Sequence, residues 1–168
     1  MRVLIAEDDL VSRRLLEGLL VKWGYDVVAT VNGGEAWQVL QQEDAPPLVV
    51  LDWAMPGLDG LELCRRVREA SDSQPPYIIL LTAREGKENI VEGLQAGVDD
   101  YVTKPFDPEE LQARIKVGVR VLGLQSALTD RLKELEDALS RIKRLQGLLP
   151  ICASCKKIRD DKGYWNQL

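Results

Sequence analysis

Short, almost continuously apolar runs alternate with longer amphipathic segments through the first hundred residues of this 168-residue chain. Runs without polar alternation are typical of strands buried on both faces of a parallel sheet, and the segments between them have helical spacing. The predicted strands are Val3–Ala6, Val27–Thr30, Leu48–Leu51, Tyr77–Leu81 and Tyr101–Val102. The predicted helices lie near Leu10–Trp23, Gly34–Gln42, Leu58–Ala70 and Gly86–Ala96, with Gly24 and Gly97 as helix caps. This alternation predicts an α/β, doubly wound parallel sheet, which binds ligands at the carboxyl ends of its strands.

The composition excludes several classes of function. The chain has no histidine, which excludes imidazole-based triads and a phosphorylated histidine of its own. Its three cysteines do not form a disulfide framework. No run approaches the ~20 apolar residues of a membrane span. Met1–Ala6 leads directly into acidic residues, unlike a secretory signal. We therefore expect a cytoplasmic protein with no membrane partner.

From Pro108 onward the pattern changes to that of one long helix. Proline followed by two glutamates favours a helix start, and the next strong helix breaker is Pro150. Within this helix, leucine and isoleucine recur at alternating spacings of four and three: Leu128, Leu132, Leu135, Leu139 and Ile142. Such a heptad seam is typical of a coiled coil.

The charges beside this seam indicate how two helices would pair. In a parallel two-stranded coil, Arg131 of one chain would face Glu136 of the other. Gln125 and Gln146 fall at core positions of the same heptad frame, and the coil is short. We expect a parallel homodimer that also needs support from the preceding domain.

Acidic side chains follow two of the predicted strands. Glu7, Asp8 and Asp9 come directly after the first strand, and Asp52 follows the third. Because the carboxyl ends of parallel strands lie at one edge of a sheet, at least three acids should converge, and such a cluster requires a cation. Oxygen-only ligands favour Mg²⁺ over zinc. The alternative for each acid is a helix cap, and Asp9 fits that alternative because a predicted helix begins near Leu10.

Two more polar residues follow predicted strands, and the whole set resembles a known family. Thr82 and Lys104 put a hydroxyl and an ammonium at the same edge. The similar segments are Glu7-Asp8, Asp52 in Leu-Asp-Trp-Ala-Met-Pro-Gly-Leu-Asp-Gly, Thr82-Ala83, and Tyr101-Val102-Thr103-Lys104-Pro105-Phe106. In this order and spacing they resemble the receiver domain of bacterial two-component response regulators. The resemblance implies a five-stranded, flavodoxin-like fold with strand order 2-1-3-4-5.

The resemblance also implies roles for the residues at this edge. Asp52 would accept a phosphoryl group from a histidine kinase or phosphotransfer protein. Lys104 and Thr82 would bind phosphoryl oxygens, which supplies the neutralisation that phosphoryl transfer requires. Thr82 and Tyr101 would form a switch pair that reports phosphorylation to the surface of the fifth helix.

The same resemblance implies a magnesium site. Asp8, Asp52 and the backbone carbonyl of Ala54 would bind the ion, and Glu7 would reach it through water. In this family the peptide bond between Lys104 and the following proline is commonly cis.

The resemblance covers residues 1–122, which we interpret as the receiver domain. Residues 123–149 are expected to form a coiled-coil helix that extends the fifth helix, and residues 150–168 a CxxC tail that is flexible or truncated. Cys152 and Cys155 have zinc-ligand spacing, but two ligands do not complete a closed site. A free reduced pair and an intermolecular Cys₄ zinc site both stay open. Cys64, on the apolar side of a predicted helix, is expected in the core.

These observations predict a phosphoacceptor that promotes its own Mg²⁺-dependent phosphotransfer and dephosphorylation and is not a classical enzyme. Its signal would pass through the fifth helix to the dimeric coil and then to a downstream output domain or protein. Nucleic-acid binding is not expected, because the basic residues of the tail are interleaved with acids. One alternative is a haloacid-dehalogenase-like phosphatase, which requires an aspartate where this chain has Ala54. Another is a constitutive dimeric scaffold.

Overall fold

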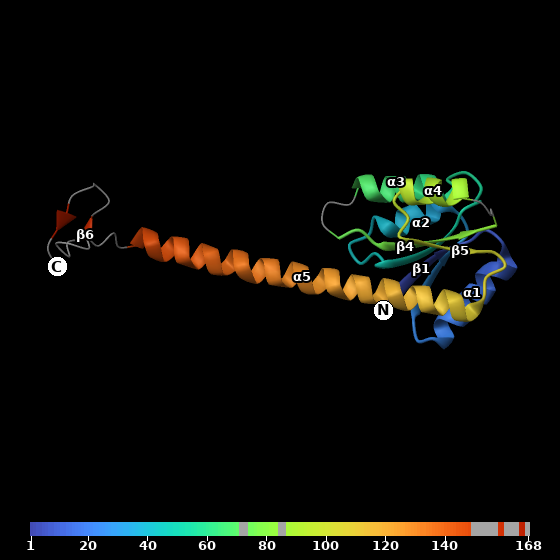
Figure 1. Cartoon of the computed structure of the whole chain (residues 1–168), viewed down its shortest axis with the longest axis horizontal. Helices are drawn as coiled ribbons and strands as arrows, with labels where there is room; N and C mark the ends of the chain where they lie inside the picture. Colours follow the sequence, from blue (N-terminus) through green and yellow to red (C-terminus); the bar gives the residue numbers. More distant parts are fainter. Residues whose placement is uncertain (71–73, 84–86, 149–157, 160–164, 167–168) are drawn as a thin grey trace. The chain divides into compact units, whose positions relative to one another are not determined.

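The computed structural model describes residues 1–70, 74–83, 87–148, 158–159 and 165–166. The chain divides into two compact units, Met1–Gln125 and Ser126–Leu168. The first unit contains a sheet of five parallel strands in the order β2-β1-β3-β4-β5 (Figure 1). This flavodoxin-like architecture and its strand order confirm the predicted fold.

The predicted helices and strands of the first unit are confirmed, with ends that differ by two residues or fewer. The strands are β1 (Arg2–Ala6), β2 (Asp26–Thr30), β3 (Leu48–Asp52), β4 (Tyr77–Thr82) and β5 (Asp100–Thr103). The helices are α1 (Leu10–Lys22), α2 (Gly33–Leu40), α3 (Gly60–Ala70), α4 (Lys87–Gln95) and α5 (Pro108–Leu148), the last of which continues into the second unit.

Helices cover both faces of the sheet, with α1 and α5 on one face and α2, α3 and α4 on the other (Figure 1). Strands β3 and β4 are buried along their whole length, as their continuous apolar runs predict. Successive residues of a strand serve opposite faces, so Val49 and Leu51 join one core cluster while Leu48 and Val50 join the other. Cys64 is fully buried in the first cluster, which confirms its predicted place in the core.

The loops at the helix ends follow from local chemistry. The Asp9 side chain accepts a hydrogen bond of 2.8 Å from the backbone N–H of Ser12 and so caps α1, as predicted. Hydrogen bonds from the backbone and the side chain of Ser12 lower the pKa of Asp9 below its ordinary value. Gly24 and Gly97 have φ angles of 87° and 89°, a left-handed conformation that favours glycine and ends the helices before them.

The described part of the second unit contains the remainder of α5 and two short strands. Strand β6 (Ile158–Arg159) pairs antiparallel with β7 (Trp165–Asn166), a ladder too short to predict from sequence. The side chain of Ile142 and both Cys152 and Cys155 lie outside the described residues. None of the described helices combines the length and apolar character needed to cross a membrane.

Candidate functional site

The strand register brings Glu7 and Asp52 together at the carboxyl edge of the sheet. Ala6, the last residue of β1, pairs with Leu51 of β3. The residues that follow them in the chain, Glu7 and Asp52, therefore lie side by side at this edge of the sheet. Both residues are buried, with 1% and 6% of their surface exposed. Two carboxylates in such an environment require positive charge nearby.

Lys104 supplies this positive charge. Its Nζ atom lies 2.8 Å from Oδ1 of Asp52 and 2.7 Å from Oε2 of Glu7. Lys104 directly follows β5, and its backbone N–H donates a 2.7 Å hydrogen bond to the carbonyl of Thr82 at the end of β4. The Lys104–Pro105 peptide bond is cis. Lys104 thus links the end of β5 to the ends of β1 and β3, where Glu7 and Asp52 lie.

The pKa shifts of Lys104 and Glu7 reflect these contacts. Burial lowers the pKa of Lys104, but its hydrogen bonds to Asp52 and Glu7 and the negative charges of these two acids together outweigh this effect, so the net pKa is raised. Burial raises the pKa of Glu7, and the negative charge of Asp52 raises it further, although the hydrogen bond from Lys104 acts in the opposite direction. The protonated lysine is therefore the favoured state.

The acidic residues also have the arrangement of a cation site. One carboxylate oxygen from each of Glu7, Asp8 and Asp52 lies within 4.8 Å of the others. Oε1 of Glu7 is buried and has no hydrogen-bond partner among the described residues. A buried carboxylate oxygen without a donor is unfavourable unless a cation or water satisfies it. This oxygen-only donor set therefore fits a hard divalent cation such as Mg²⁺.

Arg13 holds the loop that carries two of these acids. Its guanidinium Nη1 donates hydrogen bonds of 2.7 Å to the carbonyl of Glu7 and 3.0 Å to the carbonyl of Asp8. Sequence reasoning missed this residue. The available signal was its position one turn after Asp9, which puts its side chain above the end of β1.

Gly60, at the start of α3, permits a close approach to the site. A Cβ atom at this position would lie 2.3 Å from the carbonyl oxygen of Asp52. The Gly60 N–H also donates a 3.0 Å hydrogen bond to the carbonyl of Trp53. Only glycine allows the first turn of α3 to lie against the end of β3, which fixes the backbone of Asp52.

Of the remaining predicted site residues, Thr82 and Ala54 lie at the same edge, whereas Tyr101 lies two residues before the end of β5, paired with Leu80 of β4. Thr82, the last residue of β4, is 4% exposed, and Ala54 is exposed two residues after Asp52. Tyr101 of β5 is partly buried against the core, and the guanidinium carbon of Arg114 lies 5.7 Å from its ring centroid. Arg114 also pairs with Asp100 at 2.6 Å, so α5 contacts the strand that carries the predicted switch residue.

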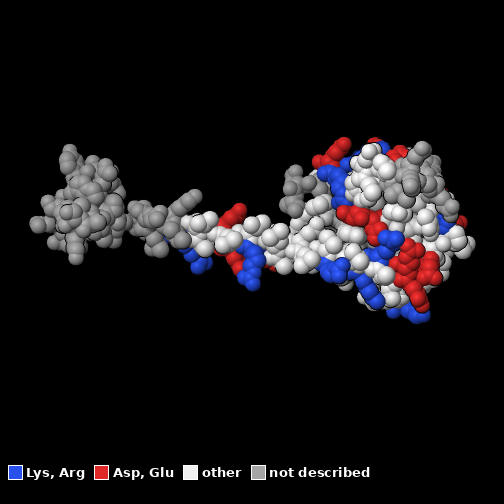
Figure 2. Space-filling model, in the orientation of Figure 1, with Lys and Arg blue, Asp and Glu red and all other residues white. Residues whose placement is uncertain are grey.

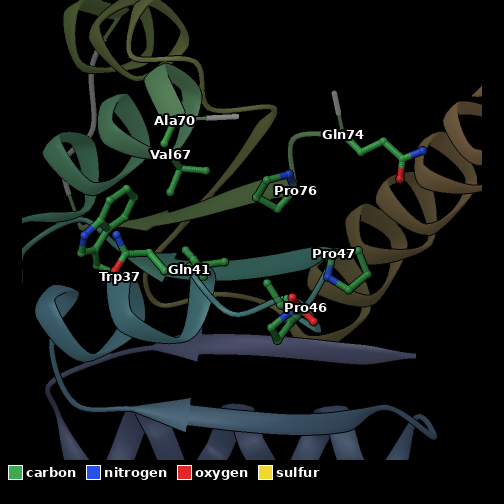
Figure 3. A pocket seen from close by; sticks show the side chains of 11 residues that line it. Trp37, Gln41, Pro46, Pro47, Val67, Ala70, Gln74 and Pro76 are labelled. Atoms are coloured by element: carbon green, nitrogen blue, oxygen red, sulfur yellow. The ribbon is translucent and has the colours of Figure 1, made fainter. Parts of the chain in front are cut away.

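A separate cavity of about 620 Å³ opens at the opposite edge of the sheet, near the starts of β3 and β4 (Figure 3). Its lining includes Trp37, Pro46, Pro47, Val67 and Pro76. The lining combines these apolar side chains with polar ones, among them Gln41, Glu43 and Gln74, whereas charged groups converge around Asp52. The converging carboxylates and the Lys104 ammonium of the candidate site lie at the carboxyl edge, away from this cavity.

A comparison with protein families identifies the class of protein. The model of the response regulator receiver domain matches residues 3–116. The chain therefore belongs to this family. Receiver domains of two-component response regulators are phosphoacceptors that interact with histidine kinases and output domains, and they are not classical enzymes.

Curated relatives agree with this assignment. The phosphate regulon transcriptional regulatory protein PhoB of Rhizobium meliloti (strain 1021) is 41% identical over 119 residues, which are 71% of this chain and 52% of that protein. The probable transcriptional regulator ycf27 of Cyanophora paradoxa is 45% identical over 115 residues, which are 68% of this chain and 46% of that protein. This chain spans about half the length of these relatives.

Solved structures share the fold. A response regulator from Chloroflexus aurantiacus J-10-fl is similar with a TM-score of 0.65 and 35% identity, over 73% of this chain and 97% of that chain. The receiver domain of the sensor histidine kinase PA1611 from Pseudomonas aeruginosa PAO1 has a TM-score of 0.63 and 30% identity, over 70% of this chain and 96% of that chain. That receiver was solved with a magnesium ion coordinated in its active site cleft.

Proposed function

We propose that Asp52 is the phosphoacceptor of this receiver domain. The observation that carries the proposal is the contact between the buried Asp52 carboxylate and the Lys104 ammonium, at 2.8 Å. An oxygen of Asp52 attacks the phosphorus of a phosphohistidine on a histidine kinase or phosphotransfer protein. A P–O bond forms as the P–N bond breaks, and the leaving imidazole takes up a proton. The product is an acyl phosphate on Asp52.

The positions of Lys104 and Thr82 suit the transferred group. Lys104 already lies against Asp52 and would pair with a phosphoryl oxygen, while the hydroxyl of Thr82 would donate to another. Burial of the site keeps these interactions strong because water screens them poorly. The same residues would also stabilise the transition state for hydrolysis, so the domain would promote its own dephosphorylation.

Mg²⁺ is the cofactor that the site best accommodates. Asp8, Asp52 and the backbone carbonyl of Ala54 would bind it, with Glu7 in reach through water. When bound, the ion neutralises negative charge on the transferring phosphoryl group. Support comes from the three converging carboxylates and the unpartnered oxygen of Glu7.

The output of phosphorylation would pass through Tyr101 and α5 into a parallel coiled-coil dimer, and then to a downstream domain or protein. Support comes from the contact of Arg114 on α5 with the Tyr101 ring. Further support comes from the predicted seam, whose leucines are 52% to 61% exposed: Leu128, Leu132, Leu135 and Leu139. In the view of Figure 2, side chains of both charges project from α5, which favours a protein partner over nucleic acid.

The test is phosphorylation by a small phosphodonor. The protein is incubated with acetyl phosphate and Mg²⁺, and its intact mass is measured. We expect one added phosphoryl group in the native protein and none in Asp52→Asn. Asp59→Asn, at an exposed helix cap, is the matched control and should be modified normally. An unchanged yield in Asp52→Asn would refute the assignment.

A further inference from the structure

Three successive carbonyl groups of the loop between β1 and α1 accept hydrogen bonds from one residue. The backbone N–H of Arg13 donates a 2.9 Å hydrogen bond to the carbonyl of Asp9. The Nη1 atom of the same residue donates to the carbonyls of Glu7 at 2.7 Å and Asp8 at 3.0 Å. Glu7 and Asp8 lie beyond the last residue of β1, so their carbonyls depend on donors outside that strand. Arg13 therefore fixes the backbone of this loop.

Asp8 depends on this restraint more than the other two acids of the cluster. The Lys104 ammonium pairs with the side chains of Glu7 and Asp52, and both of these acids are buried. Asp8 is exposed, yet one of its carboxylate oxygens lies within 4.8 Å of the other two. An exposed side chain on a loose loop loses conformational entropy when a ligand orders it. The hydrogen bonds of Arg13 hold the backbone of Asp8 in place before any ion binds.

Electrostatics alone does not account for an arginine at this position. Arg13 is the fourth residue of α1, close to the helix N-terminus, where the helix dipole disfavours a positive charge. A guanidinium beside the converging carboxylates also repels a divalent cation. Both effects oppose the residue, whereas its hydrogen bonds to the loop carbonyls favour it. The contribution of Arg13 to the site therefore comes from its hydrogen bonds and not from its charge.

We propose that Arg13 is a positioning residue for the divalent cation, and that it sets the affinity for the ion by holding the backbone of Glu7 and Asp8. The inference rests on the Mg²⁺ site of the proposed function and names a residue that is not itself a ligand. Groups that orient metal ligands typically change the affinity for the metal by about 10–100-fold. Positioning and charge predict opposite results, because loss of the positive charge alone would strengthen binding of Mg²⁺.

Titration calorimetry of the full chain with Mg²⁺ tests this role. Arg13→Met removes both the charge and the donors but keeps an unbranched side chain. Arg13→Lys keeps the charge and one donor group. Arg14→Met is the matched control, because it removes the same charge from the next, exposed position of α1. Urea unfolding without Mg²⁺ checks that each variant is folded. Arg13→Gln, which keeps a polar side chain, repeats the test if Arg13→Met does not fold.

We expect Arg13→Met to bind Mg²⁺ at least about tenfold more weakly than the native protein. Arg13→Lys should recover part of this loss, because its ammonium can donate to one of the carbonyls but lacks the fork of the guanidinium. Arg14→Met should bind within about twofold of native or slightly more tightly, since a screened surface charge has little effect. Arg13→Gln should weaken binding in the same direction as Arg13→Met.

Three results would overturn the proposal. Binding by Arg13→Met that equals or exceeds native binding would show that only the charge acts. A loss in Arg13→Lys as large as in Arg13→Met would exclude the shared donor as the cause. Equal losses in Arg13→Met and Arg14→Met would indicate a general effect of charge on α1. If the native protein itself binds no Mg²⁺, the magnesium site of the proposed function fails as well, whereas the other results leave that site intact.

Discussion

The ammonium of Lys104 lies between two buried carboxylates, 2.8 Å from Oδ1 of Asp52 and 2.7 Å from Oε2 of Glu7. Lys104 and Glu7 are 97 positions apart in the sequence, and the parallel strand order brings them together. Because the lysine offsets the charge of both acids, its removal should affect both the chemistry and the local stability of the site.

Replacing Lys104 by glutamine removes the positive charge that faces Asp52. We expect the rate of phosphorylation by acetyl phosphate at saturating Mg²⁺ to fall by about 10²-fold, the usual effect of losing one transition-state donor. Lys116→Gln is the control, since Lys116 lies on the exposed surface of α5. A rate for Lys104→Gln within twofold of native would show that the lysine does not act on the phosphoryl group.

Magnesium binding should depend on Asp8 and not on its neighbour Asp9. In Asp8→Asn we expect the affinity for Mg²⁺, measured by titration calorimetry, to fall at least about tenfold because a charged ligand is lost. Asp9→Asn should bind normally, because Asp9 caps α1 and asparagine is an equally good cap. Equal losses in the two variants would contradict the assigned ligand set.

Gly60→Ala tests the close approach of α3 to the backbone of Asp52. An added Cβ would lie 2.3 Å from the Asp52 carbonyl oxygen, so the helix start must shift. We expect the free energy of unfolding, measured with urea, to fall by about 1–3 kcal/mol. The control is Gly18→Ala in α1, where no atom lies within 4 Å of the new Cβ. That variant should gain up to about 1 kcal/mol from helix propensity, and a similar loss in both would argue against a specific contact.

The parts of this fold that could be predicted depend on local patterns. The continuous apolar run at Leu48–Leu51 predicts a buried central strand, and Asp52 directly after it predicts an acid at the sheet edge. Asp9 could be predicted as a cap because a capping residue acts within three positions. Together, such signals define the sheet, most helix ends and the acidic cluster.

The parts that could not be predicted depend on contacts between distant residues. The hydrogen bonds of Arg13 to the loop carbonyls require the exact direction of α1. The need for glycine at position 60 arises only when α3 packs against the end of β3. The cavity beside Trp37 likewise exists only once α2, α3 and two loops are assembled.

The reactivity of Cys64 should report the packing of α3. Burial raises the pKa of its thiol from 9.0 to about 11. In the Cys152→Ser, Cys155→Ser variant, we expect alkylation by iodoacetamide at pH 8 to be at least about 10²-fold slower in the native state than in urea, because the thiolate is the reactive species. The native rate should rise with pH toward 11 while the protein stays folded.

The sign of the accompanying effect on stability follows from the raised pKa. The thiol contributes stability that is fully present below pH 9.0 and decreases as the pH rises toward 11. A native alkylation rate within tenfold of the rate in urea would show that Cys64 is accessible and that α3 is not packed as described.

The most direct test of the central claim is to identify the modified residue itself. The protein is phosphorylated with acetyl phosphate and Mg²⁺, reduced with borohydride, which converts an aspartyl phosphate to homoserine, and digested for peptide mass analysis. We predict homoserine at position 52. Homoserine at Asp8 or Asp9 instead, or a phosphorylated protein with aspartate intact at position 52, would contradict the account.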